Sequence, residues 1–509
     1  MLKTPLACLL AIALGLIAPF AFAPYQLWPL MIVAFVGLLA LLKRSDAPFR
    51  VGFCFALSFY SSGLRWIHVS IYQFGGIPLL PSYLLVVLLA AYLALYPALA
   101  CWMAHKWPKQ ANKGFLYLGF PASWLLGEWL RAHILTGFPW LMPGYSQVGA
   151  PLANYASLIG VYGVTLLILW CAAACYQLLS WRKGQSLQQA FIPILVLTVL
   201  FGLQIPLARH QFTQPHAPIS VALVQGNEAI STKWAANNRM PTLNRYWRLT
   251  QAHPKADVVV WPESALPFTE YQAQEYLKYI DAQTSKRQQT LITGIIHQDR
   301  NSQDYYNALL VLGQKSRKNQ PNKAYSYGDA DRYYKRHLVP IGEYVPFESW
   351  LRPLAQLFNL PMSSLSSGSA HQRDIRVQGH HWLSAICYEI VFGTELRAMI
   401  TPNTDTILTI SDDTWFGRSI GPMQHLQIAQ MRALELQRPV VRDTNTGMTA
   451  LINVHGQITE QLPSFTTAVL TGSITPATGY TPYQRWGLLP LYLFVAAAWL
   501  GYLWQRKYQ

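Results

Sequence analysis

Charged residues are scarce in this chain. They make up 12% of its 509 residues, whereas soluble domains average about 25%, and this excludes an ordinary soluble protein. The apolar excess is concentrated in the first 208 residues and in about the last 25. Long apolar runs that recur along a chain predict a membrane protein. The stretch between these two regions predicts one water-soluble insert.

The features of a nucleic-acid-binding or metal-binding protein are also missing. The net charge of +16 is not arranged as a Lys/Arg stripe with interleaved aromatic residues, and much of it lies in short loops between apolar runs. That distribution follows the topology rule of membrane proteins, so we expect no nucleic-acid partner. The histidines are scattered without the spacing of metal ligands, and we expect neither a metal nor another cofactor.

Eight apolar segments are candidates for membrane-spanning helices, seven before the insert and one after it. Most of them reach the ~20 residues that cross about 30 Å of hydrocarbon. The first also resembles a secretory signal, but Pro24 would follow the cleavage point, and we expect a retained helix. The segments are approximately residues 5–22, 27–42, 51–70, 79–104, 115–135, 157–180, 190–208 and 486–504.

Basic residues in the short loops predict the orientation of these spans. Eight spans place the basic loops and both basic ends on one side, which the positive-inside rule assigns to the cytoplasm. The insert after the seventh span then faces the opposite, extracytoplasmic side. The basic residues concerned are Lys3, Lys43, Arg44, Arg50, Lys106, Lys109, Lys113, Arg182, Lys183, Arg506 and Lys507.

Glu128 and Arg131 lie within the fifth span, three residues apart on one helix face. An unpaired charge at the middle of a bilayer costs about 2.5–3.5 kcal/mol. The two residues therefore either neutralise each other near the interface or line a cavity that receives a polar head group. The sequence leaves both interpretations open.

The insert shows short β-branched runs separated by polar helical stretches. Several runs are continuously apolar, which is typical of strands covered on both faces. A layered α/β sandwich of one domain follows. We predict a bundle of seven spans over residues 1–208, the α/β domain over residues 218–475, and an eighth span over residues 486–504. The expected strands are 220–224, 257–261, 290–296, 308–312, 382–387, 406–410, 440–442 and 449–454, and the expected helices are 241–252, 270–285 and 422–437.

Cys387 is the one cysteine in the sequence between about Pro206 and Tyr483. Outside the cytosol it would have no partner for a disulfide within the domain. It is therefore either a buried structural residue or a thiol with a chemical task. Taken alone, the residue does not decide between the two.

Two further reactive groups accompany this thiol near the ends of predicted strands. Glu263 follows an apolar strand that Pro262 stops, and Lys335 lies between Glu263 and Cys387 in the sequence. A free thiol is mostly protonated at neutral pH, so a carboxylate that takes its proton turns it into a nucleophile. An ammonium group stabilises the thiolate and then the oxyanion of a tetrahedral intermediate. The set suits acyl transfer through a thioester.

With these residues the chain resembles the nitrilase (carbon–nitrogen hydrolase) superfamily and, more closely, its membrane-embedded branch, the apolipoprotein N-acyltransferase family. The resemblance covers nearly the whole chain and implies eight spans with a nitrilase-like αββα sandwich before the last. The chain departs from the pattern at Asp412, where the family usually has Asn. The matching segments are VALVQGN (221–227), WPESALPF (261–268), YYKRHLVPIGEYVPFE (333–348), LPMSSLSSG (360–368), ICYE (386–389), SDDTWFG (411–417) and RALELQRPVVRDTNTG (432–447).

The resemblance implies roles for individual side chains in and around the site. It also implies that the backbone N–H of Tyr388 donates to the oxyanion. The implied roles are general base for Glu263, stabiliser of charge for Lys335, nucleophile for Cys387, support of the lysine for Glu343, shaping of the pocket behind the thiol for Tyr388 and Glu389, and contact with substrate from a mobile lid for Trp234.

The implied activity is a two-step acyl transfer at the bacterial inner membrane, with the catalytic domain in the periplasm. Cys387 would take an acyl chain from a phospholipid, which the resemblance implies is the sn-1 chain of phosphatidylethanolamine. The acceptor would be the α-amine of S-diacylglyceryl-cysteine on an apolipoprotein, and nothing demands more than a monomer. We expect the apolar, aromatic stretch from Val345 to Pro361 to dip into the outer leaflet and to exclude water from the thioester.

Three other interpretations stay open at this point. A membrane-tethered amidase of the nitrilase type would use the same three residues but release a free acid. A transporter would explain the charges in the fifth span, and it predicts that Cys387→Ala retains activity. A catalytically dead lipid-binding scaffold predicts no covalent adduct.

Overall fold

The computed structural model describes residues 2–107, 112–181, 188–313, 316–317, 320–321, 324–328, 331–345 and 364–507. The chain divides into two compact units. The first comprises Met1–Tyr72, Ile77–Gln211 and Thr481–Gln509, and the second comprises Gln73–Gly76 and Phe212–Tyr480. The arm predicted between Val345 and Pro361 lies outside the described residues, apart from Val345 itself.

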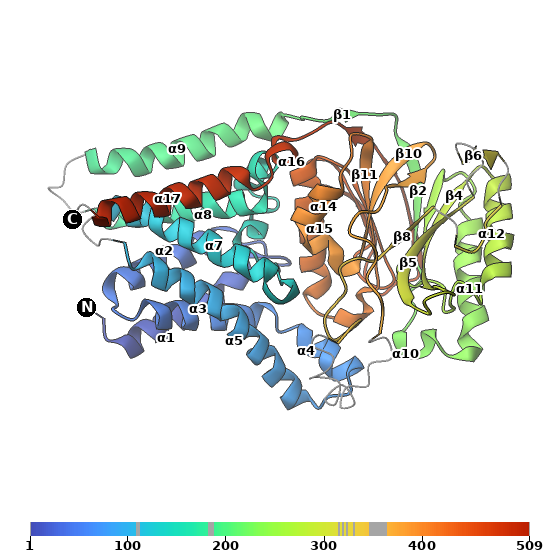
Figure 1. The fold of residues 1–509 in the computed structure, drawn as a ribbon, viewed down its shortest axis with the longest axis horizontal. Coiled ribbons are helices and arrows are strands. Elements are labelled where there is room, and N and C mark those ends of the chain that lie inside the picture. The colour runs from blue at the N-terminus through green and yellow to red at the C-terminus, as the bar shows by residue number, and fades with distance from the viewer. Residues whose placement is uncertain are drawn as a thin grey trace. The chain divides into compact units, whose positions relative to one another are not determined.

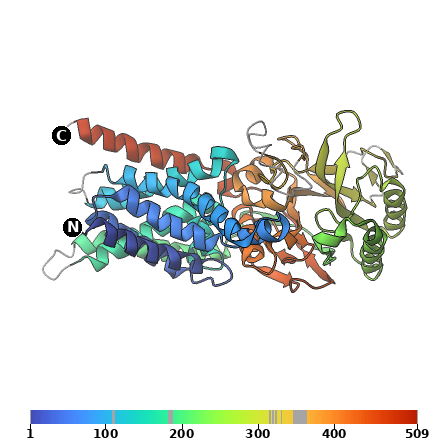
Figure 2. The same ribbon diagram turned by 90° about the horizontal axis from the view of Figure 1, so that it is seen from below.

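The first unit is helical, and each predicted apolar segment overlaps a helix. Its long helices lie side by side in both views (Figures 1 and 2). They are α1 (Thr4–Ile17), α2 (Pro29–Arg44), α3 (Pro48–Gly63), α5 (Leu79–Ala104), α7 (Phe120–His133), α8 (Ala156–Leu179), α9 (Gln188–Arg209) and α17 (Leu489–Lys507). Shorter helical turns are η1 (Ala18–Ala21), α4 (Ile67–Val69), η2 (Ser70–Phe74), α6 (Asn112–Gly114), η3 (Phe115–Gly119), η4 (Ile134–Thr136), η5 (Pro143–Gln147), η6 (Pro151–Tyr155) and α16 (Pro482–Trp486).

Glycines allow the helices α1, α3 and α5 to approach one another closely at two contacts. A Cβ on Gly15 of α1 would lie 2.2 Å from the carbonyl oxygen of Phe55 on α3. One on Gly52 of α3 would lie 2.8 Å from Sγ of Cys101 on α5. In lipid, where apolar burial does not drive helices together, close approach at small residues supplies the van der Waals contact that does. The bundle is therefore packed as membrane helices are.

Within the described residues, four helical stretches are long and apolar enough to cross a membrane. Large apolar side chains on these helices are exposed, such as Leu80 at 71% and Phe191 at 63%, and a surface of this kind is unfavourable in water. The number of eight spans and their orientation stay predictions, and Lys109, Arg182 and Lys183 lie outside the described residues. The four stretches are Thr4–Ala21, Leu79–Ala104, Pro151–Leu179 and Ala190–Arg209.

Glu128 and Arg131 form a buried ion pair on α7. Arg131 also donates to the carbonyl oxygens of Phe138 and Trp140, at 2.8 Å for Trp140. The guanidinium therefore fastens the turn that follows α7 onto its own helix. These contacts fit the self-neutralising pair of the two predicted alternatives.

The second unit contains two six-stranded sheets among its described residues. The central strands of each run parallel, and antiparallel strands complete the edges. In order across the first sheet the strands are β15 (Ala468–Ile474), β2 (Ile219–Gln225), β3 (Val258–Val260), β4 (Thr290–Gln298), β5 (Tyr305–Leu312) and β8 (Arg332–Tyr334). In the second they are β14 (Ile458–Gln461), β13 (Ala450–Ile452), β12 (Val440–Thr444), β11 (Thr404–Ser411), β10 (His380–Ile386) and β9 (Ile375–Val377). Two short ladders pair β1 (Gln214–Pro215) with β16 (Ala477–Thr478) and β6 (Ser316–Arg317) with β7 (Gln320–Pro321).

The two sheets pack face to face, and helices cover their outer faces (Figure 1). Apolar side chains of both sheets form the core between them, with Val260 and Ile292 from one sheet and Trp382 and Leu408 from the other. The covering helices are α11 (Ala236–Gln251) and α12 (Gln274–Lys286) on the first sheet and α14 (Gly393–Met399) and α15 (Gly421–Leu436) on the second. The predicted αββα sandwich is confirmed.

In the two six-stranded sheets, the strands that were not predicted from the sequence are the outer ones. Among the described residues, β8, β9, β14 and β15 end the two sheets, and none of them was expected. Most of β14 is exposed, and β15 is buried at only two of its seven positions. An edge strand pairs with one neighbouring strand and often has one face exposed to solvent. It therefore lacks the continuous apolar run from which the central strands were predicted.

Candidate active site

The carboxyl ends of the parallel strands bring together residues that are far apart in the sequence. Strand β3 ends at Val260, and Pro262 cannot continue its ladder, so the chain turns and presents Glu263. Cys387 directly follows β10, and Asp412 directly follows β11. In sheets with parallel strands, these ends form the crevice where ligands bind. Lys335 joins them from the end of the edge strand β8.

Glu263 is 7% exposed, and its carboxylate has three donors around it. Oε1 accepts from Nδ2 of Asn307 at 2.7 Å and lies 3.5 Å from Nζ of Lys335. Oε2 accepts from the backbone N–H of Asp412 at 2.8 Å. Burial raises the pKa of Glu263 above its ordinary 4.5, and the positive charge of Lys335 opposes that shift. A carboxylate of raised pKa is a stronger base, which suits it to take a proton from a thiol.

Lys335 is 1% exposed and places its ammonium group between two carboxylates. Its Nζ lies 2.8 Å from Oε1 of Glu343 and 3.5 Å from Oε1 of Glu263. Burial alone would lower the pKa of Lys335, but the negative charges of Glu343 and Glu263 outweigh it and raise the pKa above the ordinary 10.5. The lysine is therefore charged at neutral pH and can stabilise negative charge that develops beside it.

Cys387 has a φ of +56°, in the left-handed region, which costs a residue with a side chain about 1–2 kcal/mol. Its side chain is buried. Burial and the negative charge of Glu263 raise the pKa of the thiol well above 9.0, against the charge of Lys335 and a hydrogen bond from Ser411. The resting sulfur is therefore a thiol and not a thiolate, and its reaction requires a base.

This pKa shift predicts an unusual pH dependence of alkylation. We expect the rate at which iodoacetamide modifies Cys387 to keep rising above pH 9.0, whereas a free thiol with a pKa of about 8.5 levels off, because the thiolate is the species that reacts. Mass spectrometry of the peptide that contains Cys387 measures this rate apart from the other cysteines, with Cys387→Ala as the blank. A rate that levels off below about pH 8 would mean that the resting sulfur is already ionised.

Two further side chains complete the surroundings of Lys335. Glu343 is half-buried, and its Oε2 accepts from the backbone N–H of Val339 at 2.8 Å. Asn307, on β5, is 3% exposed and donates from Nδ2 to Glu263 at 2.7 Å and to Glu343 at 3.1 Å. Asn307 was not predicted from the sequence. The available signal was a single amide at the head of an otherwise apolar strand.

Glu389 joins the segment of the lysine to the segment of the cysteine. It is 3% exposed. Its Oε2 accepts from the backbone N–H of Ile386 at 2.6 Å, directly before Cys387. Its Oε1 accepts from the backbone N–H of Arg336 at 2.7 Å, directly after Lys335. The carboxylate of Glu389 therefore holds together the backbone segments that carry Lys335 and Cys387.

Tyr388 and Trp234, the two aromatic residues to which the resemblance gives a role, differ in burial. Tyr388 is buried, and its ring packs edge-on against Phe392 with the centroids 5.0 Å apart. Trp234 is half-buried and follows the short helix α10 (Ile230–Lys233) on the connection from β2 to α11. The shaping of the pocket by Tyr388, the oxyanion role of its backbone N–H and the contact of Trp234 with substrate stay predictions.

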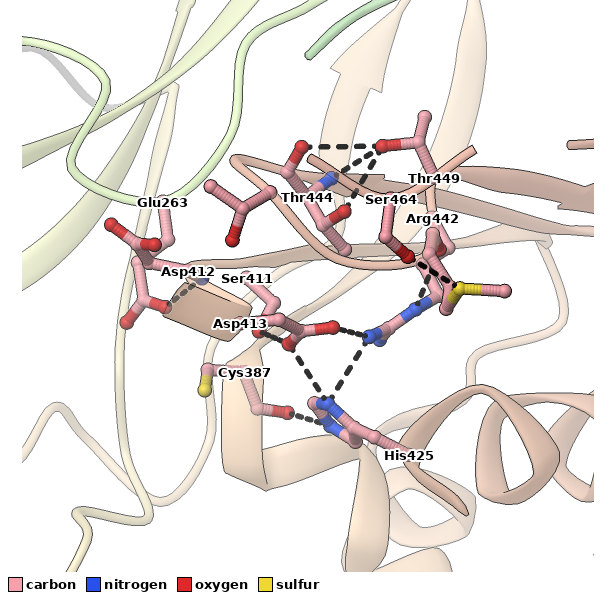
Figure 3. Close-up of polar contacts among 12 residues, drawn as sticks. Glu263, Cys387, Ser411, Asp412, Asp413, His425, Arg442, Thr444, Thr449 and Ser464 are labelled. Carbon is pink, nitrogen blue, oxygen red and sulfur yellow. Dashed lines mark hydrogen bonds and ion pairs between the residues drawn. The ribbon is translucent and has the colours of Figure 1, made fainter. Parts of the chain in front are cut away.

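A buried network that sequence analysis missed lies behind Cys387 (Figure 3). Nε2 of His425 lies 3.1 Å from the carbonyl oxygen of Cys387. Its Nδ1 lies 3.1 Å from Nη2 of Arg442, which donates to Oδ2 of Asp413 at 2.7 Å. Burial and the charge of Arg442 lower the pKa of His425, so the neutral ring can accept from Arg442 and donate to Cys387. The network supports the left-handed backbone at the sulfur.

Known family models match segments in both units of the chain. Residues 14–174 match the family described as Apolipoprotein N-acyltransferase N-terminal domain, and residues 220–482 match the family described as Carbon-nitrogen hydrolase. Among solved structures, Nit3 of Saccharomyces cerevisiae, a member of branch 10 of the nitrilase superfamily, is similar with a TM-score of 0.37. It is 17% identical, and the match covers 52% of this chain and 93% of that chain.

Two relatives that match over nearly the full length of the chain are each named apolipoprotein N-acyltransferase. The protein of Vibrio cholerae is 44% identical, and the match covers 99% of this chain and 98% of that protein. The protein of Haemophilus influenzae is 40% identical, and the match covers 95% of this chain and 92% of that protein. Identity at this level over both units assigns the family. The chain belongs to the apolipoprotein N-acyltransferase family.

Proposed function

We propose that the chain transfers a fatty acyl group from a phospholipid, through a thioester on Cys387, to the α-amine of S-diacylglyceryl-cysteine on an apolipoprotein. Membership of the family supports lipoprotein N-acylation. The observation that carries the proposed chemistry is the buried convergence of Glu263, Lys335 and Cys387, in which the charges of the first two both act on the thiol. Phosphatidylethanolamine, through its sn-1 chain, is the proposed donor.

In the first step, Glu263 takes the proton of the Cys387 thiol, and the sulfur attacks the ester carbonyl of the phospholipid. The carbonyl oxygen becomes an oxyanion, which Lys335 and the backbone N–H of Tyr388 stabilise. When the tetrahedral intermediate collapses, the C–O bond breaks and the proton on Glu263 passes to the leaving alkoxide. A lysophospholipid departs, and the acyl group stays on sulfur as a thioester.

In the second step, the amine of the apolipoprotein attacks the thioester carbonyl. Glu263 accepts the proton that the amine loses as the C–N bond forms, and the C–S bond then breaks. The departing sulfur recovers a proton from Glu263 and returns as the buried thiol. The products are an amide on the lipoprotein and the free enzyme.

The membrane setting favours acyl transfer over hydrolysis. The exposed apolar helices of the first unit support a bacterial membrane protein, and a site at the bilayer surface would have a lipid supply and little water. Eight spans, a periplasmic catalytic domain, the boundaries 1–208, 218–475 and 486–504, and a monomeric state belong to this proposal. An amidase of the same fold is the alternative, and it would release free fatty acid.

The proposal is tested by the mass of the intact protein after incubation with phospholipid alone. Because the acceptor is absent, we expect the acyl-enzyme to accumulate, with a mass increase of one acyl group in the wild type. Cys387→Ala, in which a hydrogen atom replaces the thiol group, is expected to show none. Adding a peptide with an S-diacylglyceryl-cysteine amino terminus should discharge the adduct as an amide.

Each alternative predicts another outcome of this experiment. An amidase discharges the adduct to free fatty acid whether or not the peptide is present. A transporter or a lipid-binding scaffold forms no adduct. A wild-type protein without an adduct would contradict the proposed function.

A further inference from the structure

The carboxylate of Asp412 is paired with a lysine from a distant part of the chain. Its Oδ2 lies 2.8 Å from Nζ of Lys233, and the two side chains are 7% and 1% exposed. Its Oδ1 accepts from Nδ2 of Asn445 at 3.0 Å and from the backbone N–H of Thr414 at 3.3 Å. Both oxygens of Asp412 are therefore used, and one of them neutralises a buried charge.

Lys233 is the residue through which the segment 229–235 is attached to the rest of the domain. Of residues 229–235, all of which the structure describes, Lys233 alone is buried. A lysine is almost never fully buried unless it is paired, because ordering its long side chain and removing its charge from water are both unfavourable. Without the countercharge of Asp412, little would keep this lysine, and with it the helix α10, in place.

The same two residues contact the segment of Glu263. Nζ of Lys233 lies 3.4 Å from the carbonyl oxygen of Glu263. The backbone N–H of Asp412 donates to Oε2 of Glu263 at 2.8 Å. The ion pair therefore connects an otherwise exposed helix to both the backbone and the carboxylate of the proposed base.

We propose that the ion pair of Lys233 and Asp412 is a latch that holds α10, and Trp234 directly after it, against the segment of Glu263. Asp412 is a positioning residue in this arrangement, since its carboxylate acts through Lys233. While the latch is closed, the segment shields the thioester from water, a consequence that rests on the proposed function. When it opens, water competes with the amine for the acyl group.

Three variants test the latch by hydrogen–deuterium exchange of the full-length protein in detergent without substrate. Asp412→Asn keeps an oxygen for Asn445 and Thr414 but loses the charge, Lys233→Met keeps the length of the side chain, and the third variant combines both. We expect exchange in peptides covering residues 229–239 to accelerate by at least about tenfold in each single variant. The double variant should exchange no faster than the single ones, because all three remove the same contact.

The matched control removes an exposed ion pair. Lys278→Met breaks the contact of Lys278 with Glu275 at 2.7 Å, where the side chains are 50% and 87% exposed, and we expect no change over residues 229–239. Unchanged exchange in the Asp412→Asn variant would overturn the latch. So would an equal acceleration in β10–β12, which would indicate general loosening, or a double variant whose acceleration is the product of the single ones.

A second measurement, the ratio of free fatty acid to amide product, tests whether the latch shields the thioester from water. We expect the acyl-enzyme of Asp412→Asn to give a several-fold larger share of free fatty acid relative to amide than the wild type does. A purely structural defect would slow both products alike, and an unchanged share would overturn the role in shielding. Absence of an acyl-enzyme in the wild type would contradict the proposed function, whereas the exchange measurement still decides the latch, since it needs no substrate.

Discussion

Glu263→Gln is expected to slow acylation of Cys387 by about 10²–10⁴-fold, the usual contribution of a general base. The raised pKa of the thiol leaves almost no thiolate at neutral pH, so the sulfur reacts only if a neighbouring group removes its proton. Glutamine has the size of glutamate and retains an oxygen for Asn307, but it is not a base. The measurement is the single-turnover rate of acyl-enzyme formation with excess phospholipid, followed by the mass of the intact protein.

Glu275→Gln is the matched control for this substitution. Glu275 lies on α12 and its side chain is 87% exposed, so the same change there should leave the acylation rate unaltered. If Glu263→Gln acylated within about tenfold of the wild-type rate, the proton would have to leave the thiol by another route, and the assignment of the base would be wrong.

Lys335→Met is expected to slow acylation by about 10²–10³-fold and to move its pH dependence. The charge of Lys335 opposes the rise in the pKa of Glu263, so without the lysine that pKa rises further above 4.5. Glu263 accepts a proton only when it is ionised, and the acid limb of the pH–rate profile must therefore shift to higher pH. Single-turnover acylation measured across the acidic and neutral range reports both effects.

Two other variants make this result interpretable. Lys335→Arg keeps a positive charge between Glu263 and Glu343, so its acid limb should stay near that of the wild type even if its rate falls. Lys278→Met, at the exposed pair on α12, should change neither. An acid limb that does not move in Lys335→Met would show that the lysine acts on the oxyanion alone and not on the base.

The proposed reactive groups could be selected from the sequence because each has a local signal. Glu263 follows a proline-stopped apolar run, and Cys387 and Lys335 lie in short segments that resemble a family. Asn307, a single amide in an apolar strand, and His425, on α15, lie in no such segment, because their importance depends on which strands and helices are neighbours. The partner of Asp412 is 179 residues away, so the pairing of Lys233 with it becomes visible only when the two sheets are assembled.

The fold shows the same division between local and long-range information. The central parallel strands are buried on both faces, and their continuous apolar runs identify them. The edge strands depend on a partner and on the position of solvent, which a single segment does not encode. The close helix contacts at Gly15 and Gly52 likewise depend on the neighbouring helix, although the helices themselves follow from their apolar length.

The left-handed backbone at Cys387 implies a trade-off between stability and activity at one residue. Glycine adopts this conformation without steric penalty, so a glycine at position 387 would relieve local strain and yet remove the sulfur that is proposed to carry the acyl group. The chain has the strained residue at this position, and hydrogen bonds stabilise the backbone on both sides of it. Glu389 accepts from the backbone N–H of Ile386, and His425 contacts the carbonyl oxygen of Cys387. Selection for thermal stability alone would therefore act against the proposed nucleophile.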